Sequence, residues 1–522
     1  MTGREADAER LRLAELLVGL SQVADAGMGL EPGEAARTCL LAVRLGELVG
    51  APDLGAVLYT ALLQHLGCTA YAHEAAATLG GDDIAVKSAA VRTDFSRPAD
   101  VVRTYLPALA PDAPQLTRLR AAGTAMRRAR SIAAGYQRAN CEVAMAAARR
   151  IGLGEEVAEG LGAIFEQPDG HGGPRGLRGE DIPLPARITQ VAAVASLFDG
   201  IGGPELALAT VRARAGSALD AAIADAFGRA AGDLLGELAT ADVPRAVLDA
   251  EPRPGAGVRG AGVDAVCAAF GDLVDLKSPF FHGHADRTAW LAAEAGRRLG
   301  LPDAELVALR RAGQLHDLGR IAVPSGIWER RGPLRSGEWE RVRLHAYHGE
   351  RIVAACGPLA ALVPAVGLHH ERLDGSGYHR GAGRAAIPPA ARVLAAADAV
   401  AAMTSPRPHR DALAPEAAAA ALVAERDAGR LDGDAVAAVL DAAGTPRATP
   451  RPERPAGLTE RQVEVLRLVA AGLSNPEIAR RLVVSRRTAE HHVQDIYARI
   501  GVSSRAAAAL FAMEHDLLRE DW

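Results

Sequence analysis

The chain has 522 residues, which is too long for a single hydrophobic core, so we expect two to four domains. Its 59 basic and 64 acidic residues give a formal charge of -5. This balance excludes a protein that coats nucleic acid over its whole surface, so any contact with nucleic acid must be local.

The cysteines and the apolar stretches indicate the compartment. Five cysteines are scattered without CxxC spacing, and the first residues are charged where a secretory signal would be apolar. Charged residues interrupt every apolar stretch before the ~20 residues that a membrane-spanning helix needs. We therefore expect a cytoplasmic protein with reduced thiols and no membrane partner.

Apolar residues recur at steps of three and four along most of the chain, which predicts an all-α fold. Two Pro- and Gly-rich segments, residues 251–260 and 446–457, interrupt this pattern and read as linkers. The predicted domains are residues 1–250, residues 262–445 and residues 458–522, with residues 446–457 as the linker before the last.

The first two blocks resemble each other, which indicates an internal repeat. The matching segments are Leu62-Leu-Gln64-His65-Leu-Gly with Gln314-Leu-His316-Asp317-Leu-Gly, Pro168-Asp169-Gly170 with Leu373-Asp374-Gly375, and Ile182-Pro-Leu-Pro-Ala-Arg187 with Ile387-Pro-Pro-Ala-Ala-Arg392.

The two copies share a sequence framework, but the residue types differ at several matching positions. The first copy has Glu34 for His284, Gln64 and His65 for His316 and Asp317, Ile164 and Phe165 for His369 and His370, and Ala193 for Asp398. Because apolar side chains do not bind cations, we expect the first block to be metal-free. Its expected role is structural, dimer-forming or ligand-sensing.

The second block contains an ordered array of residues that bind metals. The array comprises His284, the pair His316-Asp317, His345, the pair His369-His370, and Asp398. Imidazoles and carboxylates suit divalent iron, manganese or zinc, and a water made acidic by two cations can attack phosphorus. A single histidine is more often a surface or core residue, but the ordered set favours a metallophosphohydrolase.

Two motifs in this array carry a family resemblance. The segments Leu315-His316-Asp317-Leu-Gly-Arg320 and His369-His-Glu-Arg-Leu-Asp374-Gly-Ser-Gly-Tyr378 together resemble an HD-GYP domain. HD-GYP domains are a branch of the HD phosphohydrolases whose usual activity is hydrolysis of cyclic di-GMP. The resemblance covers about residues 274–440 and implies a helical bundle around a metal pair.

The resemblance also implies roles for single residues. It implies two divalent cations, iron or manganese, with zinc as the alternative. Asp317 would bridge both cations, with His284, His316 and Asp398 on the first and His345, His369 and His370 on the second. Asp317 and Arg320 would act in catalysis, where Arg320 grips phosphate. The loop residues Asp374, Gly375, Gly377 and Tyr378 would shape substrate access.

Four positions depart from the family pattern. Phe280 replaces a glutamate one helical turn before the first histidine, so we expect two metals and not three. Arg320 replaces lysine, His379 replaces the proline of Gly-Tyr-Pro, and Ala401 replaces a second aspartate. These changes leave the metal ligands in place but weaken the inference of cyclic di-GMP as substrate.

The last block resembles a LuxR-type helix-turn-helix domain of four helices. The resemblance rests on Leu458-Thr459-Glu-Arg-Gln-Val-Glu464-Val-Leu466, Gly472-Leu-Ser474-Asn475-Pro-Glu477-Ile478-Ala479, and Val484-Ser485-Arg-Arg-Thr488-Ala-Glu490-His-His492-Val493. Thr459, Ser474 or Asn475, and Ser485 are the expected helix caps. The third helix would enter the major groove of DNA. Its expected DNA-contacting residues are Ser485, Arg486, Arg487, Thr488, Glu490, His491, Gln494 and Arg499.

The charge of this block predicts dimerisation. From Gly457 onward it carries nine arginines and nine acidic residues, so one copy should bind DNA weakly. Tight binding would need two recognition helices, and hence a homodimer. The expected pairing face is the fourth helix, with Ala507, Leu510, Phe511 and Leu517.

The sequence therefore supports a metal-dependent phosphodiesterase of HD-GYP type, acting on cyclic di-GMP, joined to a DNA-binding output domain. Two alternatives remain open. One is a transcriptional regulator whose metal block senses a nucleotide or another ligand without turnover. The other is a phosphohydrolase of another nucleotide.

Overall fold

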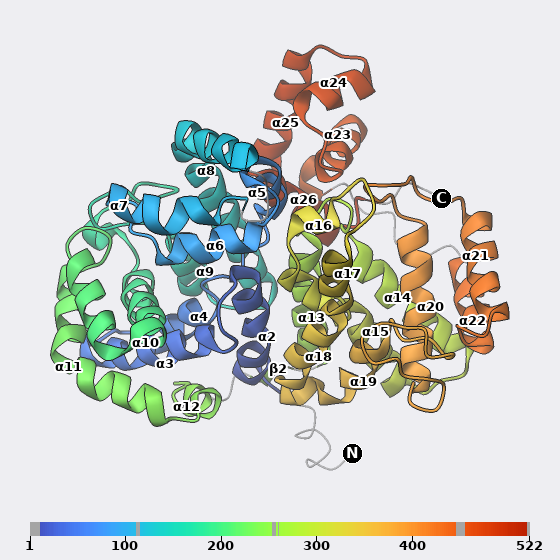
Figure 1. Cartoon of the computed structure of the whole chain (residues 1–522), viewed down its shortest axis with the longest axis horizontal. Coiled ribbons are helices and arrows are strands. Elements are labelled where there is room, and N and C mark those ends of the chain that lie inside the picture. The colour runs from blue at the N-terminus through green and yellow to red at the C-terminus, as the bar shows by residue number, and fades with distance from the viewer. Residues whose placement is uncertain (1–10, 111–114, 253–256, 259, 445–454, 519–522) are drawn as a thin grey trace. The chain divides into compact units, whose positions relative to one another are not determined.

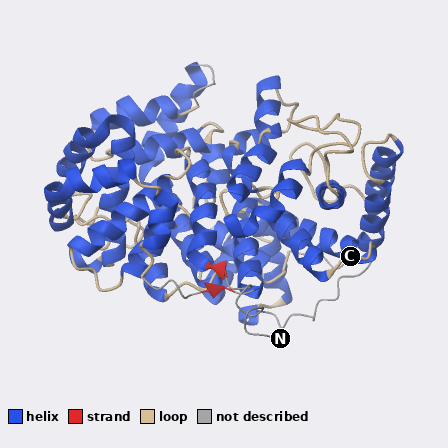
Figure 2. Cartoon of the chain, turned by 90° about the horizontal axis from the view of Figure 1, so that it is seen from below, coloured by secondary structure: helices blue, strands red, loops and turns tan. Residues whose placement is uncertain are grey.

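The computed structural model describes residues 11–110, 115–252, 257–258, 260–444 and 455–518. In these residues helices dominate, and the two strands have only two residues each (Figure 2). The predicted all-α class is confirmed. The chain divides into two compact units, of which the first holds residues 1–71, 78–266 and 356–358 and the second holds the remaining residues.

The first unit contains the first block (Figure 1). Its elements are β1 (Leu11–Arg12), α2 (Leu13–Met28), α3 (Glu34–Leu48), α4 (Leu54–Leu62), part of α5 (Ala72–Leu79), α6 (Asp83–Arg92), α7 (Pro98–Asp100), η1 (Val101–Tyr105), η2 (Leu106–Ala108), α8 (Gln115–Arg150), α9 (Glu155–Gly162), η3 (Gly179–Asp181), α10 (Leu184–Arg214), α11 (Ala221–Thr240), α12 (Val243–Asp249) and β2 (Gly257–Val258).

The core of this unit forms where α3 packs against α4 and α10. Helix α10 is the one helix in the described residues that is long and apolar enough to cross a membrane by length and composition. Its Ile188, Val191 and Ala195 are fully buried, and Gly202 and Gly203 depart from helical backbone angles. The helix therefore contributes buried residues to the core beside α3 and α4, and it bends at the two glycines.

The expected linker at residues 251–260 is only partly a linker. Gly257 and Val258 form β2, which pairs antiparallel with β1 near the start of the described chain. The Glu251 carboxylate also accepts a hydrogen bond from the Arg12 guanidinium at 2.6 Å. The segment is therefore tied to the first unit by long-range pairing, which its Pro- and Gly-rich composition does not reveal.

The second unit contains the metal block. Its elements are α13 (Gly260–Asp275, from residue 267 onward), α14 (His284–Arg298), α15 (Asp303–Leu315), η4 (Leu318–Ala322), α16 (Ser325–Trp328), α17 (Ser336–Arg343), α18 (His345–Ala354), η5 (Gly357–Leu362), α19 (Val363–Leu368), α20 (Pro389–Met403), α21 (Pro415–Asp427) and α22 (Gly433–Ala443). Helix α14 is central to the bundle, because it packs against α15, α20 and α22.

The last block also groups with the second unit. It consists of η6 (Pro455–Gly457), α23 (Glu460–Ala470), α24 (Asn475–Leu482), α25 (Arg486–Ile500) and α26 (Arg505–Glu514). Of the predicted linker 446–457, residues 446–454 lie outside the described residues. Thr459, Ser474 and Ser485 are the residues before α23, α24 and α25, and the Thr459 side chain accepts a bond from the Gln462 amide. Such caps stabilise a helix by about 1 kcal/mol each.

Burial within the domain restricts the pairing face expected for this block. Ala507, Leu510 and Leu517 are buried within the domain, where α26 packs against α23, and the Leu517 carbonyl accepts a hydrogen bond from Arg467 at 2.7 Å. These residues therefore fill the core of their own domain. Phe511, the fourth residue of the expected face, is half-buried, and pairing through this helix stays a prediction.

Candidate metal centre and DNA-binding surface

The seven predicted metal ligands lie at helix ends or inside one buried helix. His284 and His345 are the first residues of α14 and α18, and His316 directly follows α15. His369 and His370 follow the end of α19, and Asp398 lies inside α20. Helix ends that meet in a bundle place these side chains together, although up to 114 residues separate them in sequence.

The structure brings all seven side chains together in two overlapping groups. His284, His316, Asp317 and Asp398 form one group, and Asp317, His345, His369 and His370 form the other. Within each group, one possible ligand atom from every residue lies within 4.8 Å of the others. Asp317 belongs to both groups, and a carboxylate at such a position can bridge two cations.

The carboxylates of Asp317 and Asp398 hold the cluster together. Asp317 Oδ2 lies 3.2 Å from His284 Nε2 and 2.8 Å from His316 Nε2, and Asp317 Oδ1 lies 3.2 Å from His345 Nε2. Asp398 Oδ1 lies 3.1 Å from His284 Nε2. Each oxygen of Asp317 thus faces a different group of imidazoles.

Backbone hydrogen bonds orient three of the imidazoles. The Nδ1 atoms of His316, His345 and His369 lie 2.8, 2.6 and 2.6 Å from the carbonyl oxygens three residues before them. Their Nε2 atoms are buried and make no hydrogen bond, although each lies within 4 Å of Asp317. This is the usual arrangement of metal-ligating histidines, whose second nitrogen is held by a carbonyl.

Burial lowers the pKa values of three of the imidazoles, those of His284, His369 and His370. It lowers the pKa of His369 to about 3, and holds the pKa of His370 well below its usual range. Although burial opposes ionisation of Asp317, Arg320 and His316 keep the pKa of that carboxyl well below its usual value. Neutral imidazoles and ionised carboxylates are the forms that bind metal ions.

The pKa of His316 shifts in the opposite direction. Burial disfavours its charged form, but Asp317 and Asp398 outweigh this effect and raise the pKa of His316 to about 10. Without a cation, the two carboxylates therefore favour the charged form of this ring. A metal ion at this position would replace that proton.

Two arginines flank the cluster, of which Arg320 is buried and Arg407 half-buried. Arg320 Nη2 lies 2.6 Å from Asp317 Oδ2, and its guanidinium stacks on the Phe281 ring with 4.5 Å to the centroid. Arg407 lies over the same ring at 5.2 Å and donates a hydrogen bond to the Phe280 carbonyl. Burial and the nearby Arg320 lower the pKa of Arg407 to about 10. Sequence analysis found Arg320 but missed Arg407, which follows α20 outside both motifs.

The predicted access loop lies beside the second group. Gly375 has a φ of +81°, which favours glycine, and a side chain at Gly377 would lie 2.4 Å from the Glu371 Cα atom. The Tyr378 ring stacks on His370 with 4.3 Å between centroids. Asp374 accepts hydrogen bonds from the Ser376 amide and hydroxyl, so it shapes the loop.

The internal repeat extends to hydrogen bonds that the two blocks share. Glu166 accepts bonds from the amides of Arg175 and Leu177, and Glu371 accepts equivalent bonds from Arg380 and Ala382. The ion pair of Arg187 with Asp220, at 2.9 Å, corresponds to that of Arg392 with Asp432, at 3.2 Å.

The same comparison gives the first-block counterpart of His345. A side chain at Gly319 would lie 1.9 Å from the His345 carbonyl oxygen, and one at Gly67 would lie 2.2 Å from that of Asn140. Asn140 is therefore the counterpart of His345. The side chain of Asn140 donates to the Tyr136 carbonyl at 3.0 Å, and the ring of Phe165, the counterpart of His370, packs on Tyr136 at 5.6 Å. Packing and backbone hydrogen bonds occupy these positions in the first block.

The predicted DNA-contacting residues lie on the outer side of α25 and at its two ends. Seven of the eight are exposed, and Glu490 is half-buried. The opposite side of α25 packs into the domain through the buried residues Ala489, Val493 and Ile496. Arg486 forms an ion pair with Glu490 at 2.8 Å, whereas Arg487 makes no ion pair or hydrogen bond in the described structure. Arg487 is thus the guanidinium of this helix that is most available to a ligand.

Comparison with known proteins agrees with both resemblances. The family model described as HD domain matches residues 268–435, and that described as bacterial regulatory proteins of the luxR family matches residues 456–512. A cyclic di-GMP phosphodiesterase of Thermotoga maritima is 35% identical over 132 residues. That match covers 25% of this chain and 36% of the relative.

Another relative covers both the first and the second block. The 3'3'-cGAMP-specific phosphodiesterase 3 of Vibrio cholerae is 29% identical over 406 residues, which are 77% of this chain and 88% of the relative. The crystal structure of a cyclic GMP-AMP-specific phosphodiesterase of V. cholerae superposes with a TM-score of 0.58 at 25% identity. It covers 84% of this chain and 99% of that structure. The chain therefore contains an HD domain and a C-terminal domain of the bacterial luxR family, and its first two blocks are similar to a cyclic dinucleotide phosphodiesterase of V. cholerae.

Proposed function

We propose that the domain at residues 262–445 hydrolyses a phosphodiester bond of a cyclic dinucleotide, and that residues 458–522 convert its state into DNA binding. The observation that carries the proposal is the convergence of seven ligand-type side chains into two groups that share Asp317. The relatives' activities support the choice of substrate class.

The donor set fits two divalent cations. Five imidazoles and two carboxylates face one another in a buried site, and several of their Nε2 and carboxylate oxygen atoms have no hydrogen-bond partner. Such mixed nitrogen and oxygen donors suit iron or manganese, with zinc as the alternative. A bound pair of cations supplies Lewis acidity toward the phosphate and lowers the pKa of a water nucleophile. His284, His316 and Asp398 would hold one cation, His345, His369 and His370 the other, and Asp317 both.

Two arginine side chains would bind the substrate phosphate. Arg320 and Arg407 lie on the same Phe281 ring beside Asp317, so both guanidinium groups can reach anionic oxygens near the metal pair. Arginine binds phosphate through two parallel N–H groups, which orients the phosphorus as well as neutralising it. Tyr378, stacked on His370, would limit the width of the entrance for the nucleobases.

Replacing Arg407 tests this assignment. We expect Arg407→Ala to lower kcat/KM by about tenfold or more, because a hydrogen bond to a charged group is worth about 1.5–3 kcal/mol. Arg407→Lys should recover part of the loss, since it keeps the charge. Steady-state kinetics and metal content would be measured together. Unchanged kinetics in a folded Arg407→Ala protein would remove this residue from substrate binding.

Two cyclic dinucleotides are candidate substrates. The HD-GYP resemblance favours cyclic di-GMP, whereas the V. cholerae relative that covers both blocks is named for 3'3'-cGAMP. The departures at Phe280, Arg320, His379 and Ala401 bear on this choice. Both compounds would be assayed side by side with linear dinucleotides and mononucleotides as competitors. Hydrolysis of a linear nucleotide alone would support the alternative of another phosphohydrolase.

The alternative of a sensor without turnover makes a different prediction for the same assay. A sensor would bind metal and a cyclic dinucleotide but release no linear product. Turnover of bis(p-nitrophenyl) phosphate that is lost in Asp317→Ala would support the enzyme. Metal and nucleotide binding without turnover would support the sensor, and would leave the DNA-binding proposal intact.

The DNA-binding half of the proposal rests on α25. Its exposed residues Arg487, His491 and Gln494 would reach base edges, while Ser485, Thr488 and Arg499 would bind the phosphate backbone. Because the domain carries as many acidic as basic residues, two copies on successive half-sites are needed for tight binding. The cytoplasmic location also remains part of this proposal.

A further inference from the structure

The first half of α8 exposes large apolar side chains in the first unit. Leu116, Leu119 and Met126 are 60%, 70% and 63% exposed. Their spacing of three and seven residues places them on one side of the helix, opposite the buried Ala121 and Ala125. An exposed apolar stripe of this kind on a soluble domain marks a surface that contacts a partner.

The same half of α8 is strongly basic. Between Gln115 and Cys141 the helix has no acidic residue, and its arginines are Arg118, Arg120, Arg127, Arg128, Arg130 and Arg138. Within the described residues, none of these six makes an ion pair or a hydrogen bond, whereas Arg37, Arg44 and Arg187 of the same unit are paired. The partner of this surface must therefore be both apolar and acidic.

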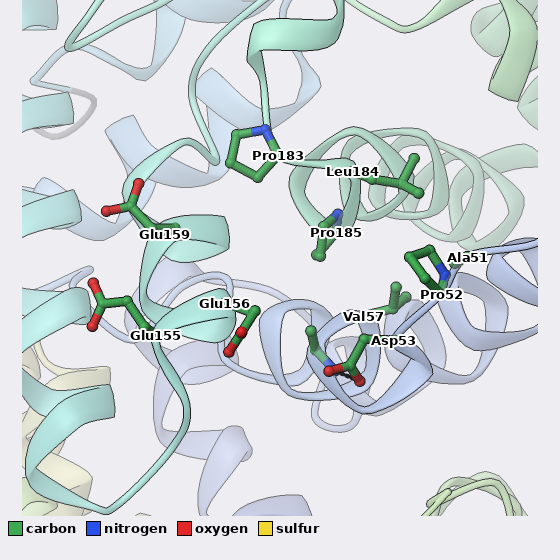
Figure 3. A pocket seen from close by; sticks show the side chains of 11 residues that line it. Ala51, Pro52, Asp53, Val57, Glu155, Glu156, Glu159, Pro183, Leu184 and Pro185 are labelled. Carbon is green, nitrogen blue, oxygen red and sulfur yellow. Dashed lines mark hydrogen bonds between the residues drawn. The ribbon is translucent and has the colours of Figure 1, made fainter.

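A surface of that chemistry exists in the same unit. A pocket of about 340 Å³ lies where the residues before and at the start of α4 meet the first turns of α9 and α10 (Figure 3). Its walls are mainly apolar, with Pro52, Pro183 and Pro185 among the lining residues. Proline-rich walls are rigid, so the pocket needs little ordering to accept aliphatic side chains.

Acidic residues surround this pocket. Asp53, Glu155, Glu156 and Glu159 line it, and Figure 3 shows the three glutamates on one side and Asp53 on the other. Glu155 pairs with Arg149 and Glu159 with Arg175, while Asp53 caps α4. Glu156 has no ion pair or hydrogen bond in the described structure. The rim has four carboxylates and only two arginines that pair with them, so its net charge is negative.

We infer that the first half of α8 from one copy docks its apolar side chains into the acid-rimmed pocket of a second copy, and that the exchange is reciprocal. A direct α8 to α8 contact would set six unpaired arginines against six others, which is repulsive. Because helix and pocket belong to one unit, a two-fold axis satisfies both surfaces at once. The contact does not depend on the proposed hydrolysis.

This dimer would supply what the DNA-binding domain lacks. Three of the four residues of the expected pairing face, Ala507, Leu510 and Leu517, are buried in their own domain. Pairing through the first unit would give the first block a role that requires no metal. It would also bring two LuxR-type domains into one assembly, as two half-sites require.

Charge reversal on each surface tests the inference in the full-length protein. Arg127→Glu with Arg130→Glu, and separately Glu156→Arg with Glu159→Arg, should each raise the dimer dissociation constant by about 100-fold or more. Light scattering coupled to size exclusion would then report monomers. Mixing the two variants should restore a dimer, because both of its contacts then pair opposite charges: the altered helix meets the altered pocket, and the unaltered helix meets the unaltered pocket. The thermal unfolding of each variant checks that its fold is intact.

An apolar variant pair provides the matched control. Leu116→Ser with Leu119→Ser should also give monomers, whereas Ile201→Ser with Leu206→Ser, at exposed sites of α10, should leave the dimer intact. A monomeric wild-type protein, dimers that persist in both charge variants, or a mixture that fails to dimerise would each overturn the inference. So would an arginine variant that loses only affinity for DNA, since α8 would then contact nucleic acid.

Discussion

Asp317→Ala is expected to remove the bound metal and to reduce phosphodiesterase activity by about 10³-fold or more, while leaving the fold intact. Asp317 is the residue that both ligand groups share, so its loss opens both groups at once. Removing metal assistance costs several kcal/mol of transition-state stabilisation, and each 1.36 kcal/mol is a factor of ten in rate. Metal analysis, circular dichroism and initial rates on both cyclic dinucleotides would be measured on the same preparation.

The first block offers a matched control for this variant. His65 occupies the position of Asp317 in the internal repeat and is half-buried, and desolvation lowers its pKa to about 4. His65→Ala should leave metal content and specific activity unchanged per folded molecule. An active Asp317→Ala protein, or loss of metal on His65→Ala without unfolding, would contradict our assignment of the site.

Arg487→Ala is expected to weaken operator binding by about 1–3 kcal/mol and to leave hydrolysis unchanged. Arg487 lies exposed near the start of α25 and forms no ion pair or hydrogen bond with the residues that the structure describes, so its guanidinium is available to a base edge or phosphate. A base contact would make the loss depend on sequence, whereas a phosphate contact would weaken all sequences and reduce the salt dependence. Affinities would be measured at several fixed salt concentrations on operator and unrelated DNA.

Arg461→Ala serves as the charge-matched control. Arg461 lies on α23, where it pairs with Glu464 and donates to the Leu482 carbonyl. Its removal changes the net charge by the same amount but leaves the outer side of α25 unaltered. Equal losses for the two variants would mean that only net charge matters, and an unchanged affinity in Arg487→Ala would place the recognition surface elsewhere.

Local patterns in the sequence predicted the fold class, several helix starts and the set of residues that form the candidate site. Helical spacing predicted the all-α class, and the caps Thr459 and Ser485 marked the starts of α23 and α25. The order of His284, His316-Asp317 and the later pairs predicted residues that the structure brings together. Such patterns succeed because the chemistry of a site restricts which residue types can stand at each position.

Features that depend on long-range packing could not be predicted from the sequence. Arg407 reaches the site only because α20 and the following loop return to Phe281, and no local spacing shows this. Asn140 could be matched to His345 only through the close approach of Gly67 and Gly319 to the two carbonyls. Periodicity on α26 revealed an apolar face but not that α23 covers it. For the same reason, the exposed stripe of α8 and the acid-rimmed pocket became visible only in three dimensions.

The central claim is that the second block holds two divalent cations and the first block none. Metal stoichiometry of the full-length protein, purified anaerobically, tests this claim most directly. We expect two iron or manganese ions per chain in the wild type and in His65→Ala, and none in Asp317→Ala. An empty wild-type protein, or metal that persists in Asp317→Ala, would contradict the account.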